Sequence, residues 1–244
     1  MHLQPAWSAP ARVGAAFSLR EGGVSTGHYA SLNVGLHVGD DAVAVAENRH
    51  RLCSVLQLPG EPLWLQQVHG IEVFDADRQP LPATPPIADA AVARRAGAVL
   101  AVMVADCLPV LFCRDDGSAI GVAHAGWRGL ASGVLEATVA ALGEARHLQA
   151  WIGPGIGAAH FEVGSEVRDA FLAAGPRATS CFVANPHGRW QCDLAGLARQ
   201  RLMDLGVARV TDSGLCTHAD AQRFYSHRRD GRTGRMVALL WLKP

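Results

Sequence analysis

Hydrophobic and polar positions along the chain follow two periods, and together they predict a mixed fold. Continuous apolar runs predict buried strands at residues 88–92, 98–104, 109–113, 120–123 and 236–242. Apolar residues three or four apart predict helices at residues 42–56, 132–142, 163–174 and 193–205. Because strands and helices alternate along the chain, the pattern indicates an α+β or α/β class.

Two weaker patterns flank the first predicted helix. Residues 31–41 alternate apolar and polar side chains and end in a Gly-Asp turn, which predicts a half-buried strand. Asp41 is placed to cap the helix at 42–56. The inward stripe of this helix is predicted to be Val45, Leu52, Val55 and Leu56. A short strand is also predicted at 62–69, and the prolines of 75–86 predict a surface loop.

Composition limits the number of domains, the classes of partner and the cellular location, but it does not identify an activity. The chain has 244 residues and no long polar linker, so we expect one domain over 1–244. With 22 basic and 22 acidic side chains, nothing indicates a nucleic-acid or membrane-surface partner. No secretory signal or membrane-length apolar run is evident, which predicts a cytoplasmic protein. Six cysteines without Cys-x-x-Cys spacing are expected to be reduced thiols. The oligomeric state stays open.

Three metal-competent side chains stand where apolar runs break off. They are His69, Cys107 and His124, and imidazole nitrogen with thiolate sulfur is a ligand set that zinc prefers, with a fourth position left for water. A metal-free reading uses the same residues, with Cys107 as nucleophile and a histidine as its base. The structural alternative is two surface histidines and a core cysteine.

Other candidates lie beside this set. Asp106 could orient a ligand or take a proton, or cap the turn before Pro109. Trp127 offers a rigid aromatic surface for a planar ring or for helix packing. The segment 228–232 concentrates three arginines, whose forked guanidinium groups suit phosphate or carboxylate, although a solvated turn would look the same.

A set of motifs then spans most of the chain: Arg20-x-Gly-Gly-Val-Ser, Ser31-Leu-Asn33-Val-Gly, His37-Val-Gly-Asp-Asp, Asn48-Arg49, Gln67-Val-His69-Gly, Ala105-Asp-Cys107-Leu-Pro, His124-Ala-Gly-Trp-Arg-Gly, Gly153-Pro-x-Ile, Phe161-Glu-Val-Gly and Ser226-His-Arg-Arg-Asp-Gly. Through them the chain resembles the YfiH-like family, also called the laccase-domain, multicopper polyphenol oxidase or peptidoglycan editing factor family. The resemblance implies a zinc site at His69, Cys107 and His124. It also implies an α+β fold, a single-domain layered α/β/β/α sandwich similar to the catalytic domain of cytotoxic necrotizing factor.

The family is associated with three chemistries, which the residues help to rank. The prediction is a zinc-dependent purine nucleoside enzyme, acting with phosphate and also deaminating adenosine, with Arg20, Asn33, Arg228 and Trp127 contacting substrate. The alternative is an editing amidase that removes a wrong amino acid from a UDP-N-acetylmuramoyl precursor. Copper-dependent phenol oxidation is weaker, because the chain has no His-x-His pair. A non-catalytic zinc-binding module is the remaining reading.

Overall fold

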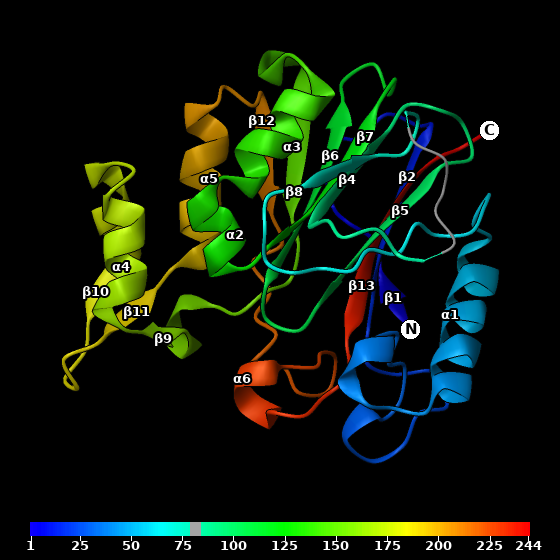
Figure 1. The fold of residues 1–244 in the computed structure, drawn as a ribbon, viewed down its shortest axis with the longest axis horizontal. Helices are drawn as coiled ribbons and strands as arrows, with labels where there is room; N and C mark the ends of the chain where they lie inside the picture. The colour runs from blue at the N-terminus through cyan, green and yellow to red at the C-terminus, as the bar shows by residue number, and fades with distance from the viewer. Residues whose placement is uncertain (79–83) are drawn as a thin grey trace.

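The computed structural model describes residues 1–78 and 84–244, and Figure 1 shows their arrangement. One sheet has four antiparallel strands in the order β1 (His2–Leu3), β2 (Val13–Ser18), β13 (Met236–Leu242) and β5 (Val99–Val104). Strands β1 and β2 lie near the N-terminus, β5 lies in the middle of the sequence, and β13 lies near the C-terminus. The sheet therefore joins the N-terminal, central and C-terminal segments of the chain.

A second sheet has six strands, and one of its faces packs against a face of the first sheet. Its order is β12 (Arg209–Asp212), β8 (Leu148–Ile152), β6 (Leu108–Arg114), β7 (Ile120–Ala125), β4 (Ala90–Ala93) and β3 (Val73–Asp75). Only the outer pairs β12–β8 and β3–β4 are parallel. A third, three-stranded sheet is formed by β10 (Phe182–Ala184), β11 (Trp190–Cys192) and β9 (Glu162–Val163).

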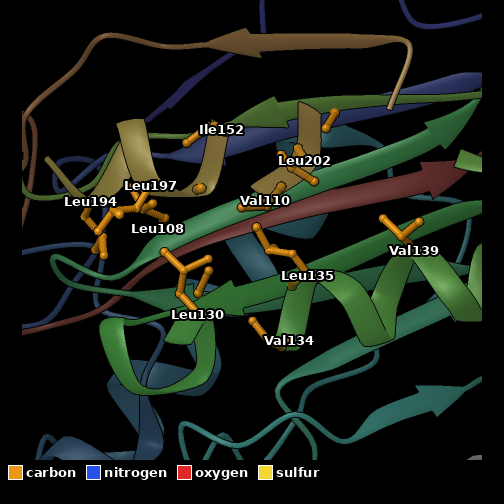
Figure 2. Close-up of a cluster of buried hydrophobic side chains, with 14 of the residues drawn as sticks. Leu108, Val110, Leu130, Val134, Leu135, Val139, Ile152, Leu194, Leu197 and Leu202 are labelled. Carbon is orange, nitrogen blue, oxygen red and sulfur yellow. The ribbon is translucent and has the colours of Figure 1, made fainter. Parts of the chain in front are cut away.

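Helices cover the outer faces of the two large sheets. Helix α1 (Ala42–Leu56) packs on the four-stranded sheet through Leu52, against strand residues such as Val99 and Val237. Helices α2 (Trp127–Ser132), α3 (Val134–Leu142) and α5 (Leu194–Asp204) pack on the six-stranded sheet. Figure 2 shows leucines and valines of these helices meeting Val110 and Ile152 of the sheet. Helices α4 (Ser165–Leu172) and α6 (His227–Asp230) lie further out.

A separate core fills the space between the two large sheets. It contains Phe17 and Leu240 of the four-stranded sheet and Val122 of the six-stranded sheet, all of them buried. Burying a side chain of this size stabilises a protein by about 1.5–3 kcal/mol. The molecule is thus a single mixed α+β domain with three sheets, and the predicted class is confirmed.

Each of the five apolar runs overlaps a strand, namely β4, β5, β6, β7 and β13, and each of the four helical spacings overlaps a helix, namely α1, α3, α4 and α5. Asp41 caps α1 as expected, since its side chain accepts hydrogen bonds from the backbone of Val43 and Ala44. The prediction of which α1 residues face inward was wrong at one position, because Val55 is 53% exposed. All six cysteines are free. Within the described residues, no helix combines the length and the apolar character that crossing a membrane requires.

Two predicted strands are wrong. Residues 31–41 form an irregular segment with a 3-10 helix at Leu36–Val38, held by the side chains of buried Asn33 and Asn48. Residues 62–69 make only isolated bridges, Leu63 to Leu100 and Gln66 to Ile87. The proline-rich loop predicted at 75–86 lies partly outside the described residues, since 79–83 are among those not described.

Candidate metal centre

The three candidate ligands meet at one end of the layer between the two large sheets. His124 belongs to β7, Cys107 directly precedes β6, and His69 lies in the loop before β3. Their ligand atoms all lie within 4.8 Å of one another, and Cys107 Sγ is 3.8 Å from His69 Nε2. The two imidazole rings meet edge to face, with centroids 4.8 Å apart. The structure therefore gathers the residues that the sequence predicted as a metal site.

Asp89, which the sequence did not single out, holds this arrangement in place. Its carboxylate accepts a hydrogen bond from His124 Nδ1 at 2.8 Å and from the backbone N–H groups of Val68, His69 and Gly70. With Nδ1 bound to Asp89, His124 keeps Nε2 for a metal, and the carboxylate fixes the orientation of the ring. Its signal in the sequence was a lone acid inside an apolar segment.

The backbone around the site adopts conformations that side chains other than glycine rarely take. His69 has φ 61° and Asp106 has φ 96°, and each lies at or next to a ligand. Residues held at positive φ cluster at functional sites, where the surrounding structure compensates for the strain. Gly126 forms the opposite wall, since a Cβ there would lie 2.8 Å from Cys107 Sγ and 2.9 Å from His69 Cδ2.

The electrostatics of the site favour a thiolate. Burial alone would raise the pKa of the Cys107 thiol, but His124 and His69 outweigh it and bring the pKa to about 6. Burial alone would lower the pKa of His124, whereas Cys107 and Asp89 raise it to about 9. By contrast, burial raises the pKa of Cys113 to about 12. The ligand sulfur is therefore the one poised to bind a metal at neutral pH.

A small cavity opens beside Cys107. It has a volume of about 130 Å³, and most of its wall is apolar. Trp127 and Phe161 contribute aromatic rings, Ile156 and Leu194 contribute aliphatic side chains, and Arg228 contributes a cation. Since His69 is exposed while His124 is buried, the metal centre is open on one side.

Asp106 anchors the loop that carries Arg228. One carboxylate oxygen accepts a hydrogen bond from Thr217 Oγ1 at 2.6 Å, and the other accepts one from the backbone N–H of Arg228 at 2.7 Å. The Arg229 guanidinium donates to the carbonyls of Thr217, His218 and Phe224. Asp106 also lines the cavity, so its two bonds fix one wall of the site.

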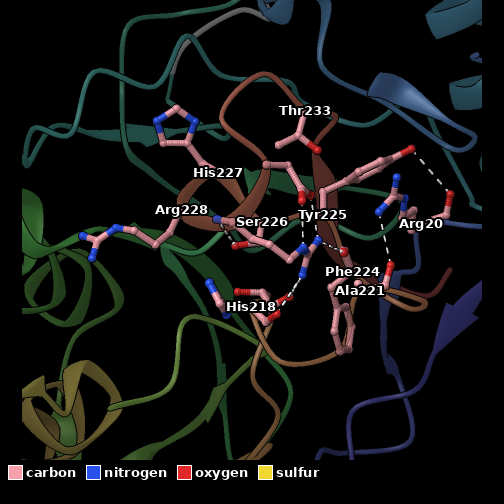
Figure 3. Close-up of polar contacts among 12 residues, drawn as sticks. Arg20, His218, Ala221, Phe224, Tyr225, Ser226, His227, Arg228 and Thr233 are labelled. Carbon is pink, nitrogen blue, oxygen red and sulfur yellow. Dashed lines mark hydrogen bonds and ion pairs between the residues drawn. The ribbon is translucent and has the colours of Figure 1, made fainter. Parts of the chain in front are cut away.

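The residues predicted to contact substrate do not all come together. Figure 3 shows Arg228 and Arg20 on opposite sides of the residues drawn, with Arg20 bonded to backbone carbonyls, at 2.8 Å to Ala30 and 3.2 Å to Ala221. The side chain of buried Asn33 is used within the protein, because it donates to Asp40 and accepts from the backbone of Arg235. Of the four residues, Trp127 and Arg228 line the cavity.

Sequence reasoning missed the remaining cavity residues. Phe161 lies in a motif that was recognised only as part of the family resemblance, and Ile156 lies in a glycine-rich turn. Their position depends on the third sheet and on a 3-10 helix at Ala158–His160, which the hydrophobic pattern does not predict. A long-range arrangement of this kind leaves little trace in a single sequence.

Comparison with known proteins places the chain. The model of the family described as multi-copper polyphenol oxidoreductase laccase matches residues 14–243. The chain belongs to this family. A protein of Pseudomonas aeruginosa named purine nucleoside phosphorylase is 52% identical over 244 residues, which is 99% of this chain and 98% of that protein. The purine nucleoside phosphorylase YfiH of Escherichia coli is 46% identical, with 98% of both chains covered.

Solved structures of the laccase family share the fold. A protein of Neisseria meningitidis matches with a TM-score of 0.95 and 44% identity, covering 100% of this chain and 99% of that one. YlmD from Geobacillus stearothermophilus matches with a TM-score of 0.89 and 31% identity, covering 100% and 99%. The family's description mentions multiple copper ions, whereas the described residues of this chain contain a single group of three or more potential metal ligands.

Proposed function

We propose that the protein is a zinc-dependent purine nucleoside enzyme. In the reaction proposed, the bond between the base nitrogen and ribose C1′ breaks while a phosphate oxygen bonds to C1′, giving free base and ribose 1-phosphate. Adenosine deamination is proposed as a second activity. The observation that carries the proposal is a metal-competent His69, Cys107 and His124 set that opens onto a cavity with two aromatic walls. The activity named for the relatives supports it.

The ligand set suits zinc. Two imidazole nitrogens and one thiolate form a ligand set known for catalytic zinc, and Asp89 orients one of the imidazoles. The exposed side at His69 leaves room for a fourth ligand. A zinc ion bound there would act as a Lewis acid and activate water.

The cavity suits a planar base. Its volume of about 130 Å³ is close to that of apolar cavities of about 150 Å³ that accept benzene, and it is open to solvent on one side. Trp127 and Phe161 can contact the faces or edges of a purine, and the Arg228 guanidinium lies 5.2 Å from the centre of the Phe161 ring. We assign Trp127 and Arg228 to substrate binding. Asp106 holds the Arg228 backbone.

A substrate panel tests the proposal. Zinc-loaded protein is incubated with adenosine and inosine in phosphate, and free base, ribose 1-phosphate and inosine are measured. We expect base release by the wild type and its loss, together with zinc, in Cys107→Ala. A protein that released no base and formed no inosine, but removed the first amino acid from a muramoyl precursor, would instead be the editing amidase. Metal-dependent melting without turnover of either substrate would indicate a non-catalytic zinc module.

A further inference from the structure

Two arginines and a histidine come from segments that do not line the cavity. Arg49 lies on α1, Arg235 directly precedes β13, and His37 lies in the 3-10 helix Leu36–Val38. The cavity is instead bounded by α2 and the loop around α6, which Figure 1 shows well away from α1. None of these three cations lines the cavity to which Arg228 belongs.

Both arginines are fixed around the same short segment of backbone. Arg49 Nε donates to the carbonyl of Val34 at 2.9 Å, and its guanidinium stacks 3.7 Å from the centre of the Trp64 ring. The backbone N–H of Val34 donates in turn to the carbonyl of Arg235 at 3.2 Å. Arg235 Nη1 is held by the carbonyls of Thr233 and Gly234. Their positions are thus set before any ligand arrives.

Neither guanidinium lies within 4 Å of a carboxylate among the described residues, although the negative charge of Glu61 acts on Arg49 from further away. Arg49 and Arg235 take part in no ion pair there, although both are partly buried. Burial lowers the pKa of Arg49 to about 10, so it stays charged at neutral pH. Arg235 Nε and Nη2 donate to no residue in the part of the chain that the structure describes. A partly buried cation with free donors costs free energy unless an anion joins it.

The arginines lie close to the end of β5 that leads to the ligand Cys107, and Arg49 Nη2 is 4.0 Å from Met103 Sδ in that strand. Burial lowers the pKa of Arg235, while the negative charges of Cys107 and Asp106 act in the opposite direction. Burial also lowers the pKa of His37, and so do the positive charges of Arg235, Arg49 and His124. Because Met236 pairs with Val104, Arg235 continues the strand pair towards Ala105 and Cys107.

We propose that Arg49, Arg235 and His37 form a phosphate-binding subsite on the α1 side of the metal centre. Forked guanidinium donors match the geometry of phosphate oxygens, and His37 adds an N–H donor at the exposed rim. The subsite rests on the proposed function in one respect, since it would hold the phosphate that attacks ribose C1′. The substrate would then span the metal centre, with its base in the cavity beside Trp127.

Phosphate binding tests the subsite without requiring turnover. The dissociation constant of inorganic phosphate is measured by calorimetry on zinc-loaded wild type, Arg235→Gln, Arg49→Gln and Arg51→Gln. Arg51 is the matched control, because it lies on the same helix but its side chain is 42% exposed and pairs with Glu47 at 2.6 Å. Removing one charged donor is expected to weaken phosphate binding about tenfold or more, and the control should bind like the wild type.

Steady-state kinetics test the phosphate subsite independently of the proposed activity. With inosine as substrate, Arg235→Gln should raise the KM for phosphate and leave the KM for inosine unchanged. Wild-type affinity for phosphate in both arginine variants would overturn the subsite, even if the protein cleaves inosine. Arginine-dependent phosphate binding without nucleoside cleavage would keep the subsite and overturn the proposed function.

Two further measurements test whether the guanidinium fork is needed and whether the subsite prefers phosphate to carboxylate. Arg235→Lys keeps the charge but loses the fork, so we expect an affinity between those of the wild type and Arg235→Gln, with an unchanged melting temperature. Acetate is added as a competitor, because the muramoyl alternative would bring a carboxylate to the same cations. Displacement of phosphate by an equal concentration of acetate would overturn the assignment to phosphate.

Discussion

At the scale of single residues, one carboxylate organises the site. Asp89 bonds to His124 and to three consecutive backbone N–H groups that include the one of His69. It therefore positions two ligands that come from separate segments of the chain. An amide at this position keeps the shape but has only one acceptor oxygen and no charge.

Asp89→Asn is expected to weaken zinc binding about 10- to 100-fold, which is the usual cost of losing a partner of a metal-bound histidine. Competition with a chromogenic chelator measures the affinity. Asp116→Asn is the control, because Asp116 is an exposed carboxylate that pairs with Arg114. An unchanged zinc affinity in Asp89→Asn would show that the ligands hold their positions without the carboxylate.

Gly126 supplies space rather than chemistry. A methyl group there would come within 2.8 Å of Cys107 Sγ, so Gly126→Ala is expected to displace the sulfur and reduce the zinc content of the purified protein. Gly175→Ala is the matched control, since a Cβ at Gly175 meets no atom within 4 Å. Elemental analysis of both variants decides the question. Full zinc occupancy in Gly126→Ala would mean that Cys107 can move without losing the metal.

The residue scale also shows what a sequence can and cannot predict about a site. His69, Cys107 and His124 stand where apolar runs stop, and that was enough to select them. Asp89 was missed because its partners lie 35 residues away at His124 and in a turn whose shape is not a local property. Arg235 was missed because a basic residue next to a strand looks like a solvated end.

At the scale of elements, burial decides what a pattern predicts well. Strands β5, β6, β7 and β13 are buried almost throughout, and their continuous apolar runs made them easy to find. Residues 31–41 showed strand-like alternation but form no strand. Buried Asn48, 15 residues after Asn33, donates to the carbonyl of Asn33 and replaces the hydrogen bonds of a strand partner.

Helix α2 was not predicted, because tertiary contacts rather than the local sequence stabilise it. Gly126, Gly129 and Gly133 lower the helical propensity of this segment, and Gly133 has φ 106° where α2 ends and α3 begins. The helix forms because its glycines allow a close approach, with a Cβ at Gly129 only 3.0 Å from the carbonyl of Gly70. Packing against the His69 loop therefore prevails over local propensity.

The loop around α6 offers a prediction with two neighbouring residues. Arg229→Met removes bonds to three backbone carbonyls and to Asp230, so it should destabilise the protein by at least about 2 kcal/mol in urea unfolding. Arg228→Met loses one bond, to the carbonyl of Glu162, and should leave stability nearly unchanged while reducing nucleoside turnover. Equal stability of the two variants would contradict the anchoring role of Arg229.

At the scale of the whole molecule, the candidate metal ligands come from segments that are distant in sequence. His69 and Cys107 are 38 residues apart, and the ligands come from one loop and from the ends of two strands. Zinc at one hundred times its dissociation constant is expected to stabilise the fold by about 2.7 kcal/mol. A chelator should therefore lower the melting temperature.

His69→Ala should remove this dependence on chelator, whereas His147→Ala should keep it. His147 is a suitable control because it is a surface histidine paired with Asp115. Differential scanning calorimetry with and without chelator measures both. A His69→Ala protein that still melts lower after chelation would place the stabilising metal elsewhere.

The pairing of β6 with β7 has a consequence for how the protein comes to hold its metal. In this pairing Pro109 lies opposite His124 and Leu108 opposite Ala125, so Cys107 and His124 share the face between the sheets. A slip of one residue would turn His124 to the helix-covered face, away from the sulfur. Because only correctly paired strands bring these two ligands together, metal binding would favour this register over the slipped one.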